Sequence, residues 1–259
     1  MIKVSNLSIE IDNQQIIKNV SYSVAQNKML SVVGESGAGK SLSVKALLNL
    51  LPQNSHASFA SIIISGKKYT SLQQLTALRG KKICLISQDG ILAFNPAYSI
   101  GTQIMESFIL HQRCSKEEAK DKTIKLLYEL NMPDPERVIN YYAKELSGGM
   151  AQRALIGMML ACDPDIIIAD EVTSALDYNN KHLILKLLKK YMLTHNKCLI
   201  FVTHEIELAE EYSDEIVVMR DGEIVDVCTN ISASDNPYTK LLLQSTTKYL
   251  YQELVSQNA

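Results

Sequence analysis

One glycine-rich stretch, residues 34–41 with the sequence GESGAGKS, constrains the possible folds of this chain most strongly. It fits the pattern G-x-x-x-x-G-K-[ST], the phosphate-binding P-loop that connects a buried strand to a helix. The apolar, partly β-branched segment 29–33 predicts that strand, and residues 42–48 predict the helix. Glycines let consecutive backbone N–H groups point toward one anion, and the helix N-terminus adds partial positive charge. The chain is therefore predicted to bind a nucleoside triphosphate.

Two side chains of the P-loop have predicted roles of their own. Lys40 can reach the β- and γ-phosphates, and the Ser41 hydroxyl can ligate Mg²⁺. The alternative interpretation is a chance glycine-rich turn before a helix, which the match at every position of the motif makes hard to sustain. The predicted nucleotide-binding residues are Gly34, Glu35, Ser36, Gly37, Ala38, Gly39, Lys40, Ser41 and Leu42.

Strands and helices alternate along the rest of the chain, which predicts the α/β class. Residues 2–24 alternate apolar and polar side chains and break at Asp12-Asn13, which indicates an antiparallel hairpin. Further strands are predicted at 62–64, 83–86, 166–169 and 198–202, with a closing hairpin at 216–227 that turns at Asp221-Gly222. Helices are predicted from 40 to about 51, within 102–131 with a capping box of Ser115 and Glu118, and at 150–161, 181–195 and 236–259.

These elements predict a single domain with two subdomains. Residues 1–94 and 159–229 are expected to form a P-loop NTPase core of the RecA-like type, which begins with an antiparallel β subdomain. Residues 95–158 lack strand signals, so they are expected to form an inserted helical subdomain. Residues 230–259 are expected to form a short helical tail.

Composition excludes several other classes of function. The net charge of −2 offers no broad basic face for nucleic acid. The five cysteines are scattered and have no C-x-x-C spacing, so we interpret them as reduced thiols rather than a disulfide framework or zinc site. The N-terminus lacks a signal-peptide pattern, and the longest apolar run, 154–162, is too short to span a bilayer. Any association with a membrane is therefore expected to go through a partner.

A second acidic motif follows the strand at 166–169. Asp170 suits a Mg²⁺ position, and Glu171 stands where a carboxylate can polarise an attacking water. The alternative is a strand that ends in ordinary surface acids. Gln88 and His204 also come just after predicted strands, at the edge where open α/β sheets bind ligands.

A Ser-Gly-Gly sequence at 147–149 precedes another predicted helix. Small residues with free N–H groups at a helix N-terminus can bind an anion, although Ser147 could also serve as an ordinary N-cap. The segment 146–150 resembles the signature motif of ATP-binding cassette (ABC) proteins, which is Leu-Ser-Gly-Gly-Gln in that family. The whole chain resembles the family through motifs in the same order: the P-loop, the Q-loop at Gln88, the signature, the Walker B strand ending at Asp170-Glu171, the D-loop at 174–177 and the switch histidine His204.

The resemblance implies a mechanism in which two cassettes enclose two ATP molecules head to tail. Ser147, Gly148 and Gly149 would contact the γ-phosphate held by the partner cassette. Glu171 would act as general base or position the attacking water, and His204 would bridge the γ-phosphate and the partner's D-loop. Gln88 would sense the water and Mg²⁺, so the implied metal-site residues are Ser41, Gln88 and Asp170.

The chain departs from the family pattern at three places. The signature ends in Met150 rather than Gln, a variant of the peptide and nickel branch. Val172 replaces the proline that normally follows Walker B. No aromatic residue stands near Ile11, where the family places one against adenine, and Tyr22 is a weak substitute by its position.

The family includes transport and non-transport ATPases, and a separate importer subunit fits this chain best. The sequence resembles the dipeptide, oligopeptide and nickel importer branch at residues 94–96, 147–153 and 236–239. Within that branch, the chain resembles the nickel ATPase in its length and in its sequence at residues 77–80 and 167–170. The implied partners are a second ABC ATPase in a heterodimer, two membrane permease subunits and an extracytoplasmic solute-binding protein, and no nucleic acid. The implied location is the cytoplasmic face of the cell membrane. The alternative is a regulatory or assembly ATPase with weak hydrolysis.

The segment 93–96 would receive a coupling helix of a membrane partner in such an importer. Two interpretations of Phe94 stay open: it is exposed for that contact, or it packs inside the helical subdomain.

Overall fold

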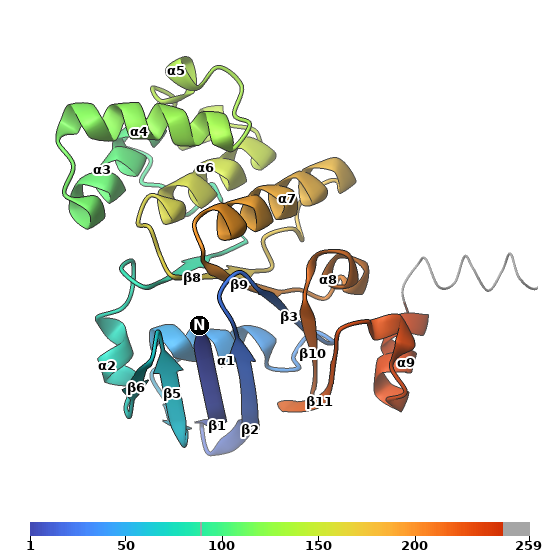
Figure 1. The fold of residues 1–259 in the computed structure, drawn as a ribbon. Coiled ribbons are helices and arrows are strands. Elements are labelled where there is room, and N and C mark those ends of the chain that lie inside the picture. The colour runs from blue at the N-terminus through green and yellow to red at the C-terminus, as the bar shows by residue number, and fades with distance from the viewer. Residues whose placement is uncertain (89, 246–259) are drawn as a thin grey trace, which may run out of the picture. The chain divides into compact units, whose positions relative to one another are not determined.

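The computed structural model describes residues 1–88 and 90–245 and divides into two compact units, which are described separately below. The first unit combines Met1–Thr76 with the chain from Cys198 onward, and the second is Ala77–Lys197 (Figure 1). Each unit holds part of the predicted site, so the fold matters here mainly for where it places those residues.

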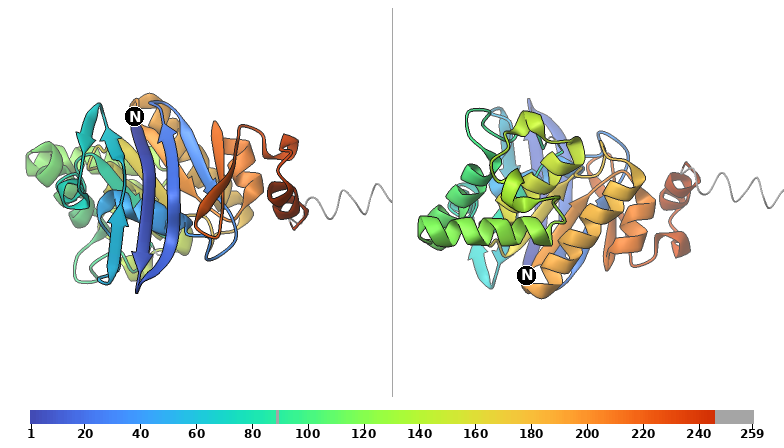
Figure 2. Two further views of the ribbon diagram at one scale, coloured as in Figure 1. Left: turned by 90° about the horizontal axis from the view of Figure 1, so that it is seen from below. Right: turned by 90° about the horizontal axis from the view of Figure 1, so that it is seen from above.

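An antiparallel sheet opens the first unit. Its strands are β1 (Ile2–Ile11), β2 (Gln14–Val24), β4 (Ser55–Ser58), β5 (Ser61–Ile64) and β6 (Lys67–Tyr69). The order is β2-β1-β5-β6, and β4 also pairs with β1; the left view of Figure 2 shows these strands in blue to cyan. Asp12 and Asn13 both have positive φ and form the turn between β1 and β2. The predicted hairpin is confirmed.

The parallel strands of the first unit carry the P-loop. They are β3 (Met29–Val33), β9 (Cys198–Val202) and β10 (Glu215–Arg220), with β11 (Glu223–Cys228) antiparallel to β10. β3 lies between β10 and β9 and runs parallel to both. Asp221 and Gly222 have φ values of 49° and 81°, and positive φ at both positions suits a tight hairpin turn. The predicted closing hairpin is therefore confirmed.

Helices of the first unit are short. They are α1 (Lys40–Lys45) with the 3-10 turn η1 (Ala46–Leu48), α2 (Leu72–Thr76), α8 (Ile206–Tyr212), η3 (Ile231–Ala233) and α9 (Pro237–Gln244). The helix after the P-loop was expected to reach about Leu51, but it stops earlier because Asn49 is left-handed, with φ 50°. The predicted C-terminal helix is present as α9, while 246–259 lie outside the described residues.

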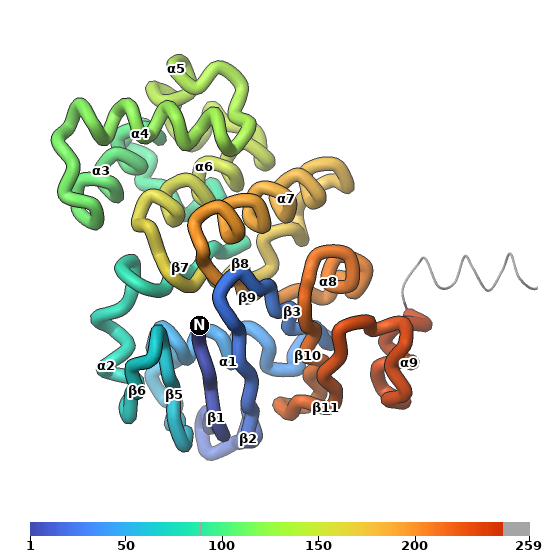
Figure 3. Tube along the Cα trace, in the orientation of Figure 1, coloured from blue at the N-terminus to red at the C-terminus, as the bar shows by residue number. Residues whose placement is uncertain are grey.

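The second unit contains two parallel strands and a run of helices. The strands are β7 (Ile83–Ile86) and β8 (Ile166–Asp170), in which Ile86 pairs with Ala169. The helices are α3 (Ile100–Gln112), α4 (Lys116–Glu129), α5 (Pro135–Val138), η2 (Ala143–Glu145), α6 (Gly148–Leu160) and α7 (Tyr178–Thr194). Figure 3 follows the chain through α3, α4, α5 and α6 without a strand between them. Ser115 and Glu118 form the predicted capping box of α4.

The observed fold class agrees with the sequence-based expectation: an α/β P-loop NTPase core, an N-terminal antiparallel sheet and an inserted helical segment. Every residue of β3, β8 and β9 is buried, as their apolar sequences predict. The sequence pattern does not indicate β4, β6, α2 or α8, because elements this short show little periodicity. Within the described part of the chain, no helix is both long and apolar enough to cross a membrane.

Candidate nucleotide-binding site

The P-loop leaves β3 and closes on itself before α1. Gly34 and Gly39 have φ values of 150° and 93°, which residues with a side chain rarely adopt. A Cβ at Gly34 would lie 2.2 Å from the Met219 carbonyl oxygen, and one at Gly39 would lie 2.4 Å from Ile17 Cδ1. A Cβ at Gly37 would meet nothing within 4 Å. The Met219 carbonyl therefore requires glycine at position 34, the positive φ favours glycine at position 39, and Gly37 lies on the open side of the loop.

Lys40 places its charge inside this loop. Its side chain is buried, and Nζ donates to the carbonyl oxygens of Gly34 and Glu35 at 2.8 Å and 2.9 Å. Ser41 and Leu42 follow, half-buried, in the first turn of α1. The arrangement holds an ammonium group among backbone atoms of the loop, where it can attract phosphate oxygens.

His204 follows the strand next to the P-loop strand. The Thr203 amide donates to the Val32 carbonyl at 3.2 Å, so the chain stays paired with β3 to the end of β9. His204 is exposed immediately after this pairing. The P-loop and His204 therefore leave neighbouring parallel strands at the same edge, as the sequence predicts.

Asp170 and Glu171 occupy the end of β8 in the second unit. Asp170 is buried, and Glu171 is half-buried with a left-handed φ of 55°. That conformation is unusual for a residue with a side chain and marks many functional sites. The Ser174 amide and hydroxyl hold the turn by donating to the Glu171 carbonyl at 3.2 Å and 2.9 Å. Val172, where the family has proline, is buried directly after this turn.

Gln88 is exposed just past β7, at the same strand edge as Asp170. The backbone beside it is attached to α6, because the Gln152 side chain donates from Nε2 to the Ser87 carbonyl at 3.0 Å. A Cβ at Gly90 would lie 2.8 Å from the Gln152 backbone nitrogen, so this segment also packs closely against α6. The Gln152 contact thereby connects the segment of Gln88 to α6, the helix that Ser147 caps.

Ser147 is the N-cap of α6. Its hydroxyl accepts a hydrogen bond from the Met150 amide at 3.3 Å, so the capping interpretation is confirmed. A Cβ at Gly148 would meet nothing within 4 Å, whereas one at Gly149 would lie 3.1 Å from Asn180 Oδ1. The helix start is thus packed on the Gly149 side and open on the Gly148 side, where an anion could approach.

A chain of polar contacts joins α6 to the start of α7. Arg153 Nη1 donates to Asn180 Oδ1 at 3.2 Å, and Asn180 Nδ2 donates to Asp177 Oδ2 at 2.6 Å. Asp177 also caps α7 by accepting from the Asn180 amide at 3.0 Å, which explains why α7 begins at Tyr178 rather than Lys181. Hydrogen bonds from the Asn180 amide and side chain lower the pKa of the Asp177 carboxyl.

Exchanging the side chains of Asp177 and Asn180 tests the hydrogen bond between them. We expect Asn180→Asp to lower the unfolding temperature at neutral pH, because two carboxylates then face each other and the Arg153 guanidinium that contacts position 180 can offset the charge of only one of them. The double variant Asp177→Asn with Asn180→Asp should regain most of the loss, since asparagine also caps helices and restores a donor. The lowered pKa of Asp177 means that its contribution is complete at neutral pH and is lost as the pH falls through the folded-state pKa. Thermal unfolding of the unmodified protein and these two variants would contradict the contact if the double variant were no more stable than Asn180→Asp.

Two aromatic residues of the sequence analysis are not available for surface contacts. Tyr22 is buried, its hydroxyl lies 3.5 Å from the Ser43 carbonyl, and burial raises its pKa. It offers no open ring face to a base, so the substitute role by position is wrong. Phe94 is only 5% exposed, while Leu92 nearby is 82% exposed. The interpretation of Phe94 as an exposed contact residue is therefore wrong, and Leu92 is an exposed apolar residue of that segment.

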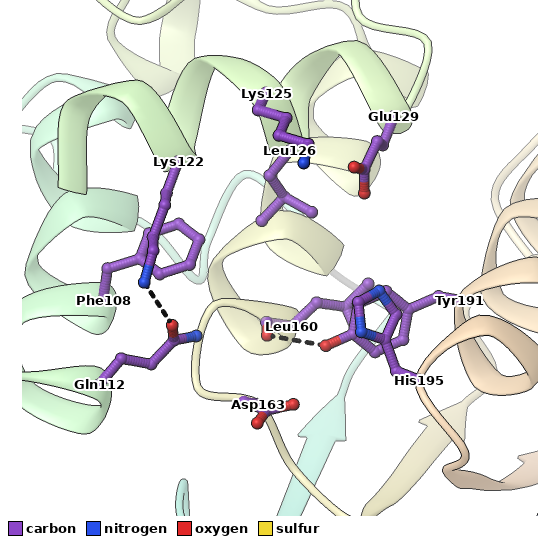
Figure 4. Close-up of a pocket in the computed structure, with 10 residues that line it drawn as sticks. All are labelled: Phe108, Gln112, Lys122, Lys125, Leu126, Glu129, Leu160, Asp163, Tyr191 and His195. Atoms are coloured by element: carbon purple, nitrogen blue, oxygen red, sulfur yellow. Dashed lines mark hydrogen bonds between the residues drawn. The ribbon is translucent and has the colours of Figure 1, made fainter. Parts of the chain in front are cut away.

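A pocket of about 260 Å³ lies elsewhere in the second unit (Figure 4). Lys122 Nζ donates to Gln112 Oε1 at 3.0 Å on one side, and Tyr191 donates to the Leu160 carbonyl at 3.2 Å on the other. His195 stacks on the Tyr191 ring with centroids 4.2 Å apart. None of the residues predicted for nucleotide binding lines this pocket.

Comparisons with known proteins extend over nearly the whole chain. A family model described as ABC transporter matches residues 17–174. The dipeptide transport ATP-binding protein DppD of Haemophilus influenzae is 36% identical, covering 96% of this chain and 78% of that protein. The glutathione import ATP-binding protein GsiA of Shigella flexneri is 34% identical, covering 94% of this chain and 41% of that protein. A dimeric cassette, MJ0796 in a post-hydrolysis state with ADP and Pi, matches with a TM-score of 0.74 and 27% identity over 88% of this chain and 98% of its own.

Proposed function

The chain belongs to the ABC transporter family of ATP-hydrolysing enzymes, and we propose that it energises an importer that takes up peptides through separate membrane subunits. The observation that carries this proposal is the P-loop geometry: Lys40 is buried inside the loop, and position 34 leaves no room for a Cβ. The chain that holds this loop is similar to DppD along 96% of its length. ATP is the substrate, and its phosphates would lie against the open side of the P-loop.

Two cassettes would share each ATP molecule. Residues 34–42 of one cassette would hold the phosphates, and Ser147, Gly148 and Gly149 of the other would complete the site from the open start of α6. Glu171 would polarise the attacking water, and His204 would contact the γ-phosphate from the end of β9. The similarity to a dimeric cassette supports this arrangement.

Mg²⁺ fits the chemistry of the residues present. Ser41 offers a hydroxyl oxygen and Asp170 a buried carboxylate, and hard oxygen ligands of this kind suit Mg²⁺. Among the residues that the structure describes, no three His, Cys, Asp or Glu side chains gather to hold a metal ion. Mg²⁺ usually keeps several waters and binds mainly to substrate phosphates, and we propose Gln88 as a further residue of its site. Bound there, Mg²⁺ would neutralise charge on the β- and γ-phosphates.

Partners supply the selectivity of such a system. We propose a second, related ATPase, two permease subunits on whose cytoplasmic face the chain sits, and an extracytoplasmic binding protein. The exposed Leu92 beside buried Phe94 would contact a permease helix. Peptides are preferred to nickel or a metal–chelator complex as cargo because DppD and GsiA are named for dipeptides and glutathione. No finding favours the alternative of a regulatory ATPase with weak hydrolysis.

The decisive experiment is reconstitution in liposomes with the second ATPase, the permease subunits and the binding protein. We expect Mg²⁺-dependent ATP hydrolysis that rises several-fold when the binding protein carries a dipeptide. If nickel but not peptide stimulates hydrolysis, the chain would still serve an importer, but its cargo would be nickel and not peptide. A rate of ATP hydrolysis that is the same with and without the permease subunits and the binding protein would contradict the importer function.

A further inference from the structure

Two adjoining cavities of the second unit have no part in the nucleotide chemistry described above. One is the pocket of about 260 Å³ in Figure 4, and a second of about 280 Å³ lies beside it between α4 and α7. The residues that line both cavities are Lys125, Leu126, Glu129, Tyr191 and His195. Small-molecule sites begin at about 300 Å³, so cavities of this size suit a ligand no larger than an amino acid or a short peptide.

The walls of these cavities are partly apolar. Leu126, Leu160 and Leu187 are buried residues that line one or both of them. Tyr191 adds an aromatic ring that is held in place, because His195 stacks on it with centroids 4.2 Å apart and its hydroxyl donates to the Leu160 carbonyl at 3.2 Å. A ligand in this space would therefore place an apolar group against leucine side chains.

Charged side chains of both signs border the same space. Figure 4 shows Lys125 and Glu129 on α4 directed toward it, across from Tyr191 on α7. Side chains four residues apart on a helix can form an ion pair, yet Lys125 and Glu129 form neither an ion pair nor a side-chain hydrogen bond with any residue that the structure describes. Lys190, which lines the second cavity, also has no such contact within the described part of the chain. The cavities therefore offer a cation and a carboxylate to a ligand.

The other charged groups of the first cavity already have contacts. Asp163 forms an ion pair with Lys197, whose Nζ lies 2.6 Å from its Oδ1. Lys122 Nζ donates to Gln112 Oε1 at 3.0 Å. Of the two carboxylates that line the cavities, Glu129 is thus the one without an ion pair among the described residues. Any ligand that enters must lie close to this carboxylate as well as to the lysine one turn before it.

A ligand with a single charge would be attracted by one of these two side chains and repelled by the other, whereas a zwitterion offers a charge-assisted hydrogen bond to each. We propose that the two cavities bind a small zwitterion with an apolar side chain, which is a free amino acid or a short peptide. Its carboxylate binds Lys125, its ammonium binds Glu129, and its side chain lies against Leu126. This site goes beyond the importer function proposed above, and its occupation does not require ATP.

Titrations of the purified full chain, followed by NMR of the ligand, test the site with leucine and with leucyl-leucine, which distinguish the amino acid from the peptide. We expect saturable binding of at least one of them. Amidation of its carboxylate or acetylation of its amine should each raise the Kd about tenfold, the effect of one charge-assisted hydrogen bond. The inference is overturned if neither compound shows saturable binding, or if the amidated or acetylated compound binds as tightly as the zwitterion.

Two substitutions assign the charges to their partners. Lys125→Gln should raise the Kd of the zwitterion about tenfold and leave that of the amidated compound unchanged, whereas Glu129→Gln should raise it as much and leave that of the acetylated compound unchanged. Both residues are exposed, so the unfolding temperature should hardly change. Lys120→Gln is the matched control, because it removes an exposed lysine of α4 that lines neither cavity, and it should change no Kd. If Lys125→Gln and Glu129→Gln bound the zwitterion as tightly as the unmodified protein does, the ligand would lie elsewhere and the inference would be wrong.

Discussion

Glu171→Gln is expected to lower the steady-state rate of ATP hydrolysis at least about 100-fold while ATP still binds. Glutamine matches the size of glutamate and can keep the left-handed turn that Ser174 stabilises, but it cannot take a proton from water. The P-loop is unchanged by the substitution, so phosphate binding should persist. ATP-bound dimers should accumulate, because the step that opens them is blocked.

Rates of phosphate release and size-exclusion chromatography with and without ATP measure both effects. Glu117→Gln, an exposed carboxylate in the first turn of α4, is the matched control and should leave the rate near that of the unmodified protein. Turnover within a few-fold of that rate in Glu171→Gln would show that another group activates the water. Loss of ATP binding would show that the turn after β8 had collapsed.

Local chemistry explains which elements could be predicted. The hairpin at Asp221-Gly222, the capping box of Ser115 and Glu118, and the fully apolar strands depend on residues close together in sequence. The predicted start of α7 at Lys181 is too late, because Asp177 caps the helix through its side chain and a cap followed by polar residues gives little periodic signal.

In the candidate site, too, local features could be predicted from the sequence, and features that depend on distant contacts could not. Each predicted residue follows a strand or begins a helix, which sequence can indicate, and those positions are observed for Gln88, Glu171 and His204. The left-handed backbone of Glu171 could not be predicted, because glutamate has no preference for it and the Ser174 contacts impose it. The burial of Phe94 depends on packing between distant segments, for which a single sequence carries no signal.

A substitution at Ser147 can separate its role as helix cap from its proposed contact with phosphate, and it is expected to have a large effect on ATP hydrolysis. Aspartate caps helices as well as serine does, and a negative charge near a helix N-terminus is stabilising. Ser147→Asp should therefore preserve α6 and keep or raise the unfolding temperature. In the shared site the same carboxylate would face the γ-phosphate held by the other cassette, beside the open position Gly148.

Repulsion between that carboxylate and the phosphate should lower ATP-dependent dimerisation and turnover by about 100-fold, since facing like charges in an interface cost several kcal/mol. Ser115→Asp provides the control, because Ser115 caps α4 in the same unit through the same kind of bond, from the Glu118 amide at 3.2 Å. It should change neither activity nor dimerisation. Ser147→Asn, an equally good but neutral cap, should lose much less activity than Ser147→Asp. If Ser147→Asp kept full turnover, Ser147 would be only a helix cap, and the start of α6 would not meet the partner's ATP.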